Sequence, residues 1–383
     1  MRATLERVAS RLHSRPTLRS RGLRARLVVW LGAGLATLAS AATNGAEATP
    51  RAIVIAPYDA SSLAADEQWM GEAVAQVISL GLVWQQGLVQ IEPARFRSVV
   101  DPIVWDETHV AQAARAVRAD TALYGTIVRK DSGLLLQPRL LDLKSGQPTP
   151  LPPMAFTEAE TVAQLASLAR IYAQALLPAL TGGERTRIER AARPTSSLPA
   201  LELFARGQTA FYDGDNTNAV DLLVRAVEAD QSFAPATLSL GVVHAALGNR
   251  WKAAALFRAT FMLEPKMPEP FKALGDLYLS VPRNLFDQAI EAYSKAIELR
   301  PFYADAHAWL GDAHIAKGDV SLAVDAYRRA IAFDPFNPRT HLRLGRAYAA
   351  KGRCTDAANE YRRVGELDPH YAAVPAPCPT NTP

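Results

Sequence analysis

A repeat with a period of 34 residues fills the C-terminal half of the chain and constrains its fold more than any other feature. One glycine recurs at steps of 34, 34, 36 and 34 residues, at Gly207, Gly241, Gly275, Gly311 and Gly345. Further along each unit stands an alanine, at Ala219, Ala253, Ala289, Ala323 and Ala357. Four residues later comes Leu223, Phe257, Tyr293, Tyr327 or Tyr361, and the last four units end in Pro265, Pro301, Pro335 and Pro369. Five units in register predict one supersecondary element that is stacked five times.

The residue types within a unit predict two antiparallel helices. Gly and Ala suit the positions where the helices approach closely, the large residue fills the space beside them, and Pro stops the second helix. Over residues 200–369 the pattern resembles the tetratricopeptide repeat. The first unit departs from it, with Arg206 before its glycine and Gln231 where Pro is expected. Other residues hold the place of the family's Trp: Leu203, Thr237, Phe271, His307 and His341. The resemblance implies a superhelix with a concave groove.

Residues 50–150 have a different character and predict a compact α/β domain with a mixed sheet. We expect strands at 51–57, 87–91, 121–128 and 134–143, and helices at 66–83 and 108–118, from apolar runs and helical spacing. The segments AIVIAP, Gly71, Gly87-Leu88, ADTALYGTIVRKDSG and LLDLKSG resemble the N-terminal domain of the TolB family. No propeller signature follows, so the transport role of that family is not carried over.

The remaining segments complete an α+β multidomain prediction. Residues 157–198 are predicted to connect the α/β domain to the repeats. They include an amphipathic helix over 157–180, which begins with a capping box of Thr157 and Glu160. Gly182-Gly183 is expected to end that helix, and 184–197 to form a charged connector. An all-α tetratricopeptide solenoid is expected over 199–370, and a disordered Pro-rich tail over 371–383.

The N-terminus predicts export. Residues 1–26 carry eight Arg and one acid, an apolar run of 12 residues follows at 27–38, and Ala39-Ser40-Ala41 is a small-residue cleavage pattern. We expect a signal peptide at 1–41 and a periplasmic or secreted protein. An uncleaved inner-membrane anchor is the alternative, and only in that form is a membrane a partner. The whole chain has a net charge of +4, and the basic segment alone carries +7. The rest of the chain therefore carries 4 − 7 = −3, and this negative charge argues against nucleic acid as a partner.

The two cysteines, Cys354 and Cys378, are too few for a disulfide scaffold. In an oxidising compartment a bridge between them would tie the tail to the last repeat. Two free thiols remain the alternative.

Motifs for chemistry are absent from the sequence, which favours a protein that is not an enzyme and needs no cofactor or metal. His307, His314 and His341 could meet at a metal, but packing residues with satisfied polar edges are the simpler interpretation. Asp106 and Glu107, next to His109, are explained by capping of the helix that follows. Residues 213–216 faintly resemble a calcium loop but fit better as the turn inside the first repeat.

These observations favour an exported, non-catalytic adaptor that binds a protein or peptide through its concave groove. A small-ligand or glycan sensor using the α/β domain, and an envelope enzyme, are the alternatives. Helical periodicity places these residues in the groove: Phe204, Gln208, Phe211, Tyr212, Leu238, Val242, Ala245, Lys272, Asp276, Asp312, Ile315 and Arg346. The groove is then apolar and aromatic at its start, acidic in the middle and basic at its end. Alternatively, Phe204 and Phe211 pack against the 157–180 helix, which could itself fill the groove.

Overall fold

A computed structural model describes residues 50–100, 104–177, 179–281 and 285–368. The predicted signal segment and the predicted tail lie outside these residues. Within them, no helix has both the length and the apolar character needed to cross a bilayer.

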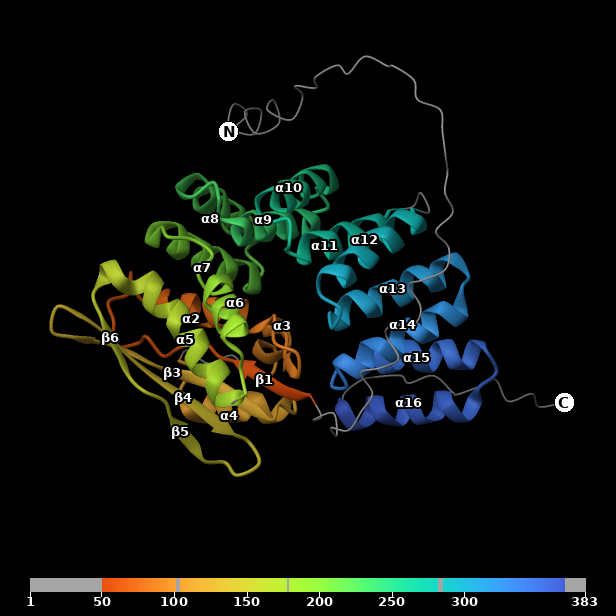
Figure 1. Cartoon of the computed structure of the whole chain (residues 1–383), viewed down its shortest axis with the longest axis horizontal. Helices are drawn as coiled ribbons and strands as arrows, with labels where there is room; N and C mark the ends of the chain where they lie inside the picture. Colours follow the sequence, from red (N-terminus) through yellow and green to blue (C-terminus); the bar gives the residue numbers. More distant parts are fainter. Residues whose placement is uncertain (1–49, 101–103, 178, 282–284, 369–383) are drawn as a thin grey trace, which may run out of the picture. The chain divides into compact units, whose positions relative to one another are not determined.

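A six-stranded mixed sheet forms the N-terminal region, as the sequence predicts (Figure 1). Its strands are β1 (Arg51–Ile55), β2 (Leu88–Gln90), β3 (Thr121–Lys130), β4 (Gly133–Asp142), β5 (Pro148–Pro150) and β6 (Met154–Phe156). β1 pairs in parallel with β2 and with β3, whereas β4 runs antiparallel to β3, β5 and β6. The two short strands β5 and β6 carry too few residues to show an alternating pattern in the sequence.

Within the described residues, the N-terminal region also contains helices and a short 3₁₀ turn. They are α2 (Met70–Leu82), α3 (Pro93–Arg97), α4 (Glu107–Ala116), η1 (Glu158–Glu160), α5 (Thr161–Leu176) and α6 (Gly182–Ala191). The capping box of Thr157 and Glu160 is present before η1. The prediction for Gly182-Gly183 is wrong, because this pair begins α6 instead of ending the preceding helix. Thr181 and Glu184 form a second capping box there, and it supplies the backbone partners that start a helix.

Antiparallel helix pairs follow, one for each of the five predicted repeats. The first helices are α7 (Leu198–Tyr212), α9 (Ala234–Ala246), α11 (Glu269–Leu279), α13 (Ala304–Lys317) and α15 (Pro338–Ala350). The second helices are α8 (Asn216–Ala229), α10 (Arg250–Leu263), α12 (Phe286–Leu299), α14 (Val320–Phe333) and α16 (Cys354–Leu367). A Cβ at the repeated glycine would collide with the large side chain of the second helix in each unit, for example with the ring of Tyr293 at Gly275. The close approach inferred from the sequence is therefore confirmed.

The turns within the repeats also have a common geometry. Gly214, Gly248, Gly318 and Gly352 have positive φ angles between 70° and 95°, in repeats 1, 2, 4 and 5. A residue with a side chain is strained in this conformation, so glycine is required at the turn. The third repeat carries the two-residue insertion inferred from the sequence, and residues 282–284 of its turn lie outside the described part of the chain.

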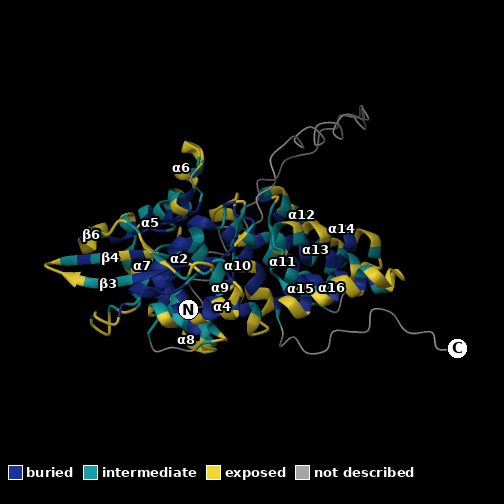
Figure 2. Ribbon diagram, turned by 90° about the horizontal axis from the view of Figure 1, so that it is seen from below, coloured by how far each residue is buried: buried dark blue, intermediate teal, exposed yellow. Residues whose placement is uncertain are grey.

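One hydrophobic core runs from the sheet into the first two repeats. It joins Leu123 and Ile127 of β3, through Val74 and Ile78 of α2, to a set of repeat residues that includes Phe204, Leu223, Phe233 and Leu240. Ten of the thirteen α2 residues are buried, because α2 packs on α5 and α6 on one side and on α7 on the other. Figure 2 shows this concentration of buried residues around α2. Residues 50–368 belong to one compact unit, which contains both the predicted α/β domain and the predicted repeats.

Candidate functional site

The concave side of the first repeat is occupied by the α/β region. Phe204 is only 2% exposed and packs on Phe233, with ring centroids 5.0 Å apart. Phe211 is half-buried against the same core. The prediction that Phe204 anchors a partner in the groove is corrected, because its ring is a core element that joins two repeats. The helix that packs on α7 is α2, whereas the alternative drawn from the sequence named the 157–180 helix.

Tyr212 is held by residues of the α/β region. The Arg97 guanidinium lies over its ring at 4.8 Å, and the Gln76 side-chain amide donates to its hydroxyl at 3.4 Å. Arg97 also forms an ion pair with the buried Glu72. Burial, with the nearby Glu72 carboxylate, raises the pKa of the Tyr212 hydroxyl. Tyr212 therefore joins the first repeat to the α/β region, and the half-buried Gln208 lies one turn away from it on α7.

Hydrogen-bonded aspartates lie in the third and fourth repeats, on the side predicted to be concave. Asp276 follows the repeat glycine in α11, and it accepts a hydrogen bond from the Tyr293 hydroxyl at 2.8 Å. Asp312 occupies the same position in α13 and accepts from the Tyr327 hydroxyl at 2.6 Å. In the first two repeats these aspartates are replaced by Gln208 and Val242, and the tyrosines by Leu223 and Phe257. The hydrogen-bonded pairs of aspartate and tyrosine therefore begin at the third repeat.

Trp309 lies between cations from both neighbouring repeats. The Lys272 ammonium of α11 is 5.6 Å from the Trp309 ring centroid, and the Arg343 guanidinium of α15 is 4.4 Å from it. Lys272 also pairs with Asp276 at 2.8 Å, and Arg343 with Asp312 at 3.0 Å. We call Lys272, Asp276, Trp309, Asp312 and Arg343 the groove ladder. It spans the first helices of three consecutive repeats.

The sequence analysis missed Trp309 and Arg343, although it identified the other three members of the groove ladder. Both residues stand two positions before the repeat glycine, and the periodicity argument used only the positions one after, three before and four after it. A signal was available, because a Trp and an Arg in place of the small residues Ala205 and Ser239 of the first two repeats mark a change of surface.

Burial and charge pairing shift the pKa values of the ladder groups. Burial raises the pKa of the Asp312 carboxyl, and the Arg343 guanidinium partly offsets this effect. Burial works against the Lys272 ammonium, but Asp276, Tyr303 and Asp305 together outweigh burial and raise the pKa of Lys272. The Tyr293 and Tyr327 hydroxyls donate to the two aspartates of the ladder. Burial and these aspartates raise the pKa of both hydroxyls. The ladder therefore combines two ion pairs with an aromatic ring.

The predicted charge gradient along the groove is corrected in its middle part. Asp276 and Asp312 are each neutralised by a cation of the chain itself, so this part is not a net acidic surface. Leu238 and Ala245 are half-buried and pack with a cluster around Phe257. Three predicted residues are exposed: Val242 at 37%, Ile315 at 42%, and Arg346. The open groove is thus the ladder with Ile315 and Arg346.

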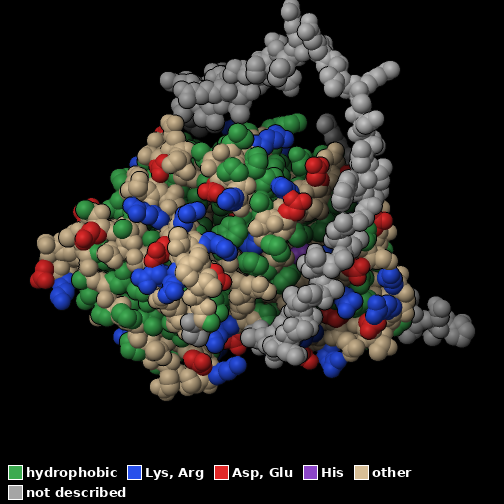
Figure 3. All heavy atoms as spheres, in the orientation of Figure 1, with side chains coloured by type: hydrophobic (Ala, Val, Ile, Leu, Met, Phe, Trp, Pro, Cys, Tyr) green, Lys and Arg blue, Asp and Glu red, His purple; other side chains and the backbone are tan. Residues whose placement is uncertain are grey.

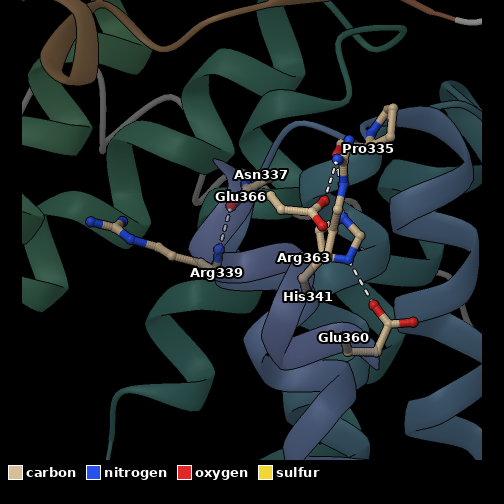
Figure 4. Close-up of polar contacts among 7 residues, drawn as sticks. All are labelled: Pro335, Asn337, Arg339, His341, Glu360, Arg363 and Glu366. Atoms are coloured by element: carbon tan, nitrogen blue, oxygen red, sulfur yellow. Dashed lines mark hydrogen bonds and ion pairs between the residues drawn. The ribbon is translucent and has the colours of Figure 1, made fainter. Parts of the chain in front are cut away.

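His307 and His341 are buried at repeat boundaries, but the buried Nδ1 atoms of His307 and His314 have no hydrogen-bond partner within the described residues, so not all of their polar edges are satisfied. His341 directs Nε2 at the Pro335 carbonyl at 3.2 Å and Nδ1 at the Glu360 carboxylate at 2.7 Å (Figure 4). His307, at the same repeat position, has its Nε2 2.8 Å from the Pro301 carbonyl. In both units the imidazole contacts the carbonyl of the proline that ends the preceding repeat. The described residues contain no group of three or more His, Cys, Asp and Glu side chains that could hold a metal ion.

The two other polar clusters are local structure, as the sequence analysis inferred. Asp106 caps α4 and accepts from the His109 backbone N–H at 2.9 Å, while Glu107 accepts from the Tyr124 hydroxyl at 2.7 Å. Asp215 caps α8 and accepts from the Asn218 backbone N–H at 3.1 Å, so residues 213–216 form the turn of the first repeat.

The predicted disulfide stays a prediction. Cys354 begins α16, and Cys378 lies outside the described residues. A mass difference of about 2 Da between the intact and the reduced protein would establish the bridge, which the loop-entropy estimate values at about 3 kcal/mol.

A polar cleft of about 780 Å³ lies between the α/β region and the first repeat. It opens where β1 ends, and residues from both parts line it, among them Asp59, Trp69, Arg97, Trp105 and Arg206. Open α/β sheets commonly place ligand clefts beyond the carboxyl ends of their strands. The cleft is the second candidate site.

Comparison with known proteins confirms the tetratricopeptide repeats. The tetratricopeptide repeat model matches residues 204–260 and 274–338. The chain is similar to the crystal structure of MamA, with 25% identity over 42% of this chain and 93% of that chain and a TM-score of 0.37. It is also similar to a thermophilic TPR protein of Thermus thermophilus, with 19% identity, 45% and 93% coverage and a TM-score of 0.41. No curated protein matches the sequence. The likeness of the α/β region to the TolB N-terminal domain stays a prediction.

Proposed function

We propose that this protein is a scaffold that binds a protein partner at the groove ladder and at Ile315 and Arg346 beside it. The observation that carries the proposal is the partly accessible Trp309, which cations from the two neighbouring repeats contact. Tryptophan and arginine supply much of the binding energy in protein interfaces when a partner covers them. The match to tetratricopeptide repeats supports a protein or peptide as the ligand.

The chemistry of the groove indicates the kind of segment it accepts. Asp276 and Asp312 already have cationic partners, whereas no ion pair within the described residues involves Arg346. Ile315 offers an exposed apolar side chain in the same groove. A peptide segment with an apolar side chain next to a carboxylate is complementary to this surface, and the carboxylate would pair with Arg346.

Export belongs to the same proposal. The basic, apolar and small-residue order of residues 1–41 supports a periplasmic or secreted scaffold, and an inner-membrane anchor is the alternative. N-terminal sequencing of the mature protein is expected to start near Ala42. Retention of Met1 in a membrane fraction would support the anchor instead.

Affinity capture from cell-envelope extract, followed by calorimetry with the purified partner, tests the binding site. We expect Trp309→Ala combined with Arg343→Gln to weaken binding by about 30-fold or more, since hot-spot residues contribute about 2 kcal/mol or more. Leu322→Ala is the matched control, because it removes a 51% exposed side chain from α14 outside the ladder. Equal affinity of the double variant and the control would contradict the proposal.

The cleft supports a second candidate function, a sensor of a small polar ligand. The Arg97 Nε is buried and has no hydrogen-bond partner within the described residues, so one donor at this cleft is unsatisfied. A library of anionic metabolites and glycans, screened by thermal shift, tests it. A ligand that stabilises the wild type but not Arg97→Lys would favour the sensor function.

A further inference from the structure

The second repeat carries most of the exposed large hydrophobic side chains of the described residues. Five of the eight exposed large hydrophobic side chains of the described residues belong to α9, α10 and the turn between them. Trp251 is 85% exposed and Met262 is 65% exposed, with Leu247 at 44% and Leu263 at 41%. Trp251 and Met262 are eleven residues apart, which at 100° per residue places them on one face of α10. Between them on that face lie Ala255 and Arg258.

The other second helices carry polar residues on the equivalent face. The position of Trp251 is held by Thr217, Asp287, Ser321 and Thr355. The position of Ala255 is held by Asp221, Glu291, Asp325 and Asn359. The position of Met262 is held by Glu228, Glu298, Ala332 and Glu366. The fold of the repeat therefore does not require an apolar outer face, and α10 lacks the polar residues that its four counterparts carry at most of these positions.

The same helix is cationic. α10 contains Arg250, Lys252 and Arg258 and no acid. None of these three cations forms an ion pair within the described residues, although α8 and α12 on either side expose acids of their own. Figure 3 shows hydrophobic side chains with Lys and Arg close by in this part of the surface. We call Leu247, Arg250, Trp251, Lys252, Arg258 and Met262 the α10 face.

We propose that the α10 face docks on the surface of an anionic lipid bilayer. Unpaired cations are complementary to anionic headgroups, and tryptophan is suited to the boundary between headgroups and acyl chains. Trp251 protrudes from this face beside the start of the helix, since most of its side chain is exposed. A fluid bilayer adapts to a protruding side chain, whereas a protein partner must offer a matching pocket. An acidic protein surface is the competing occupant.

Docking in this orientation leaves the groove ladder accessible. The α10 face is opposite to the side that packs on α9 through Ala253 and Phe257, and the ladder lies on first helices of later repeats. A bilayer on the outer side of α10 would not cover Trp309. The docking proposal does not depend on the proposed function, and either can fail without the other.

Vesicle co-sedimentation tests the proposal, with phosphatidylcholine vesicles that contain or lack phosphatidylglycerol. Both the full chain and residues 49–383, the compact unit, are used, so that binding through the apolar run at 27–38 is measured separately. We expect the wild type to prefer the anionic vesicles. Replacement of Arg250, Lys252 and Arg258 by Gln is expected to weaken binding by about 100-fold, since each cation near an anionic surface contributes roughly fivefold. Trp251→Ala combined with Met262→Ala is expected to weaken it by about tenfold.

Leu322→Ala is the matched control and is expected to bind as the wild type does. The proposal is overturned if residues 49–383 bind neither kind of vesicle, or if the α10 variants bind as the control does. Equal binding to both kinds of vesicle would also overturn it. If a soluble poly-glutamate peptide binds through the α10 face while anionic vesicles do not, the occupant is an acidic protein surface and the lipid proposal is wrong.

Discussion

The first two repeats and the last three have the same helical hairpins but make different contacts with the rest of the molecule. The core of the α/β region continues into the first two, through Phe204 and the helix α2. In the last three, the concave side carries the groove ladder, with aspartates, cations and a tryptophan. One repeat motif thus supplies a packing surface at one end of the array and a polar groove at the other.

The difference arises from a few positions in each unit. The residue after the repeat glycine is Gln208 or Val242 in the first two repeats and Asp276 or Asp312 in the next two. The large residue of the second helix gains a hydroxyl, as Tyr293 and Tyr327, in the repeats that carry aspartate. The tyrosine hydroxyls thus supply hydrogen-bond donors to these partly buried carboxylates.

Phe204→Ala should have the largest effect, because its ring is part of the core that joins the two regions. We expect a loss of about 3–5 kcal/mol in the free energy of unfolding, the range for truncating a buried Phe. Chemical denaturation followed by circular dichroism measures it. A loss below about 1 kcal/mol would mean that the first repeat does not rely on this contact.

Asp334→Asn should stabilise the protein above pH 6. Burial raises the pKa of the Asp334 carboxyl to about 6, so the folded state favours the protonated form. The stability that this form contributes is complete below the ordinary pKa of 3.8 and is lost as the pH rises through 6. The variant avoids that loss, which is up to about 3 kcal/mol.

Unfolding of this variant at pH 4 and at pH 7 provides the measurement. The advantage of the variant over the wild type is expected to grow between these values. Asp325→Asn, an exposed change on α14, is the control and should show no such growth. An advantage that is equal at both pH values would show that Asp334 is ionised in the folded state throughout.

Trp309→Ala should have the smallest effect on stability, although it is expected to weaken partner binding strongly. Trp309 is only half-buried, and its neighbours Lys272 and Arg343 keep their aspartate partners when the ring is removed. We expect a loss of about 1 kcal/mol in the free energy of unfolding. A loss as large as that of Phe204→Ala would show that Trp309 is a core residue and that the two ends of the array do not differ as described.

The sequence predicted the parts of the fold that depend on local pattern. The repeat glycines, alanines and large residues follow from the close approach of two helices, and the parallel and antiparallel strands follow from apolar runs. The covering of the first repeat was not predicted, because it depends on which surfaces meet. A signal for it exists in α2, whose only charged residue is Glu72. A helix that is apolar on all sides must be buried on all sides.

The candidate site was predicted only in part for a similar reason. Helical periodicity selected Lys272, Asp276 and Asp312, which belong to the groove ladder, because one helix determines its own faces. The pairing of Asp312 with Arg343 joins two repeats and depends on their stacking, which the period alone does not specify. Likewise, α6 was missed because the glycine pair was taken as a helix end, whereas Thr181 and Glu184 form a capping box there.

Native-state hydrogen exchange on the full chain tests most directly whether the first repeats belong to the α/β core. We predict that amides of α2, α5 and α7 share one opening free energy, because their side chains form one cluster, and that amides of α15 and α16 open separately at a lower free energy. If instead α7 opened together with α15 and α16, and α2 and α5 opened apart from them, the five repeats would be an independent solenoid and the comparison between the two ends of the array would be wrong.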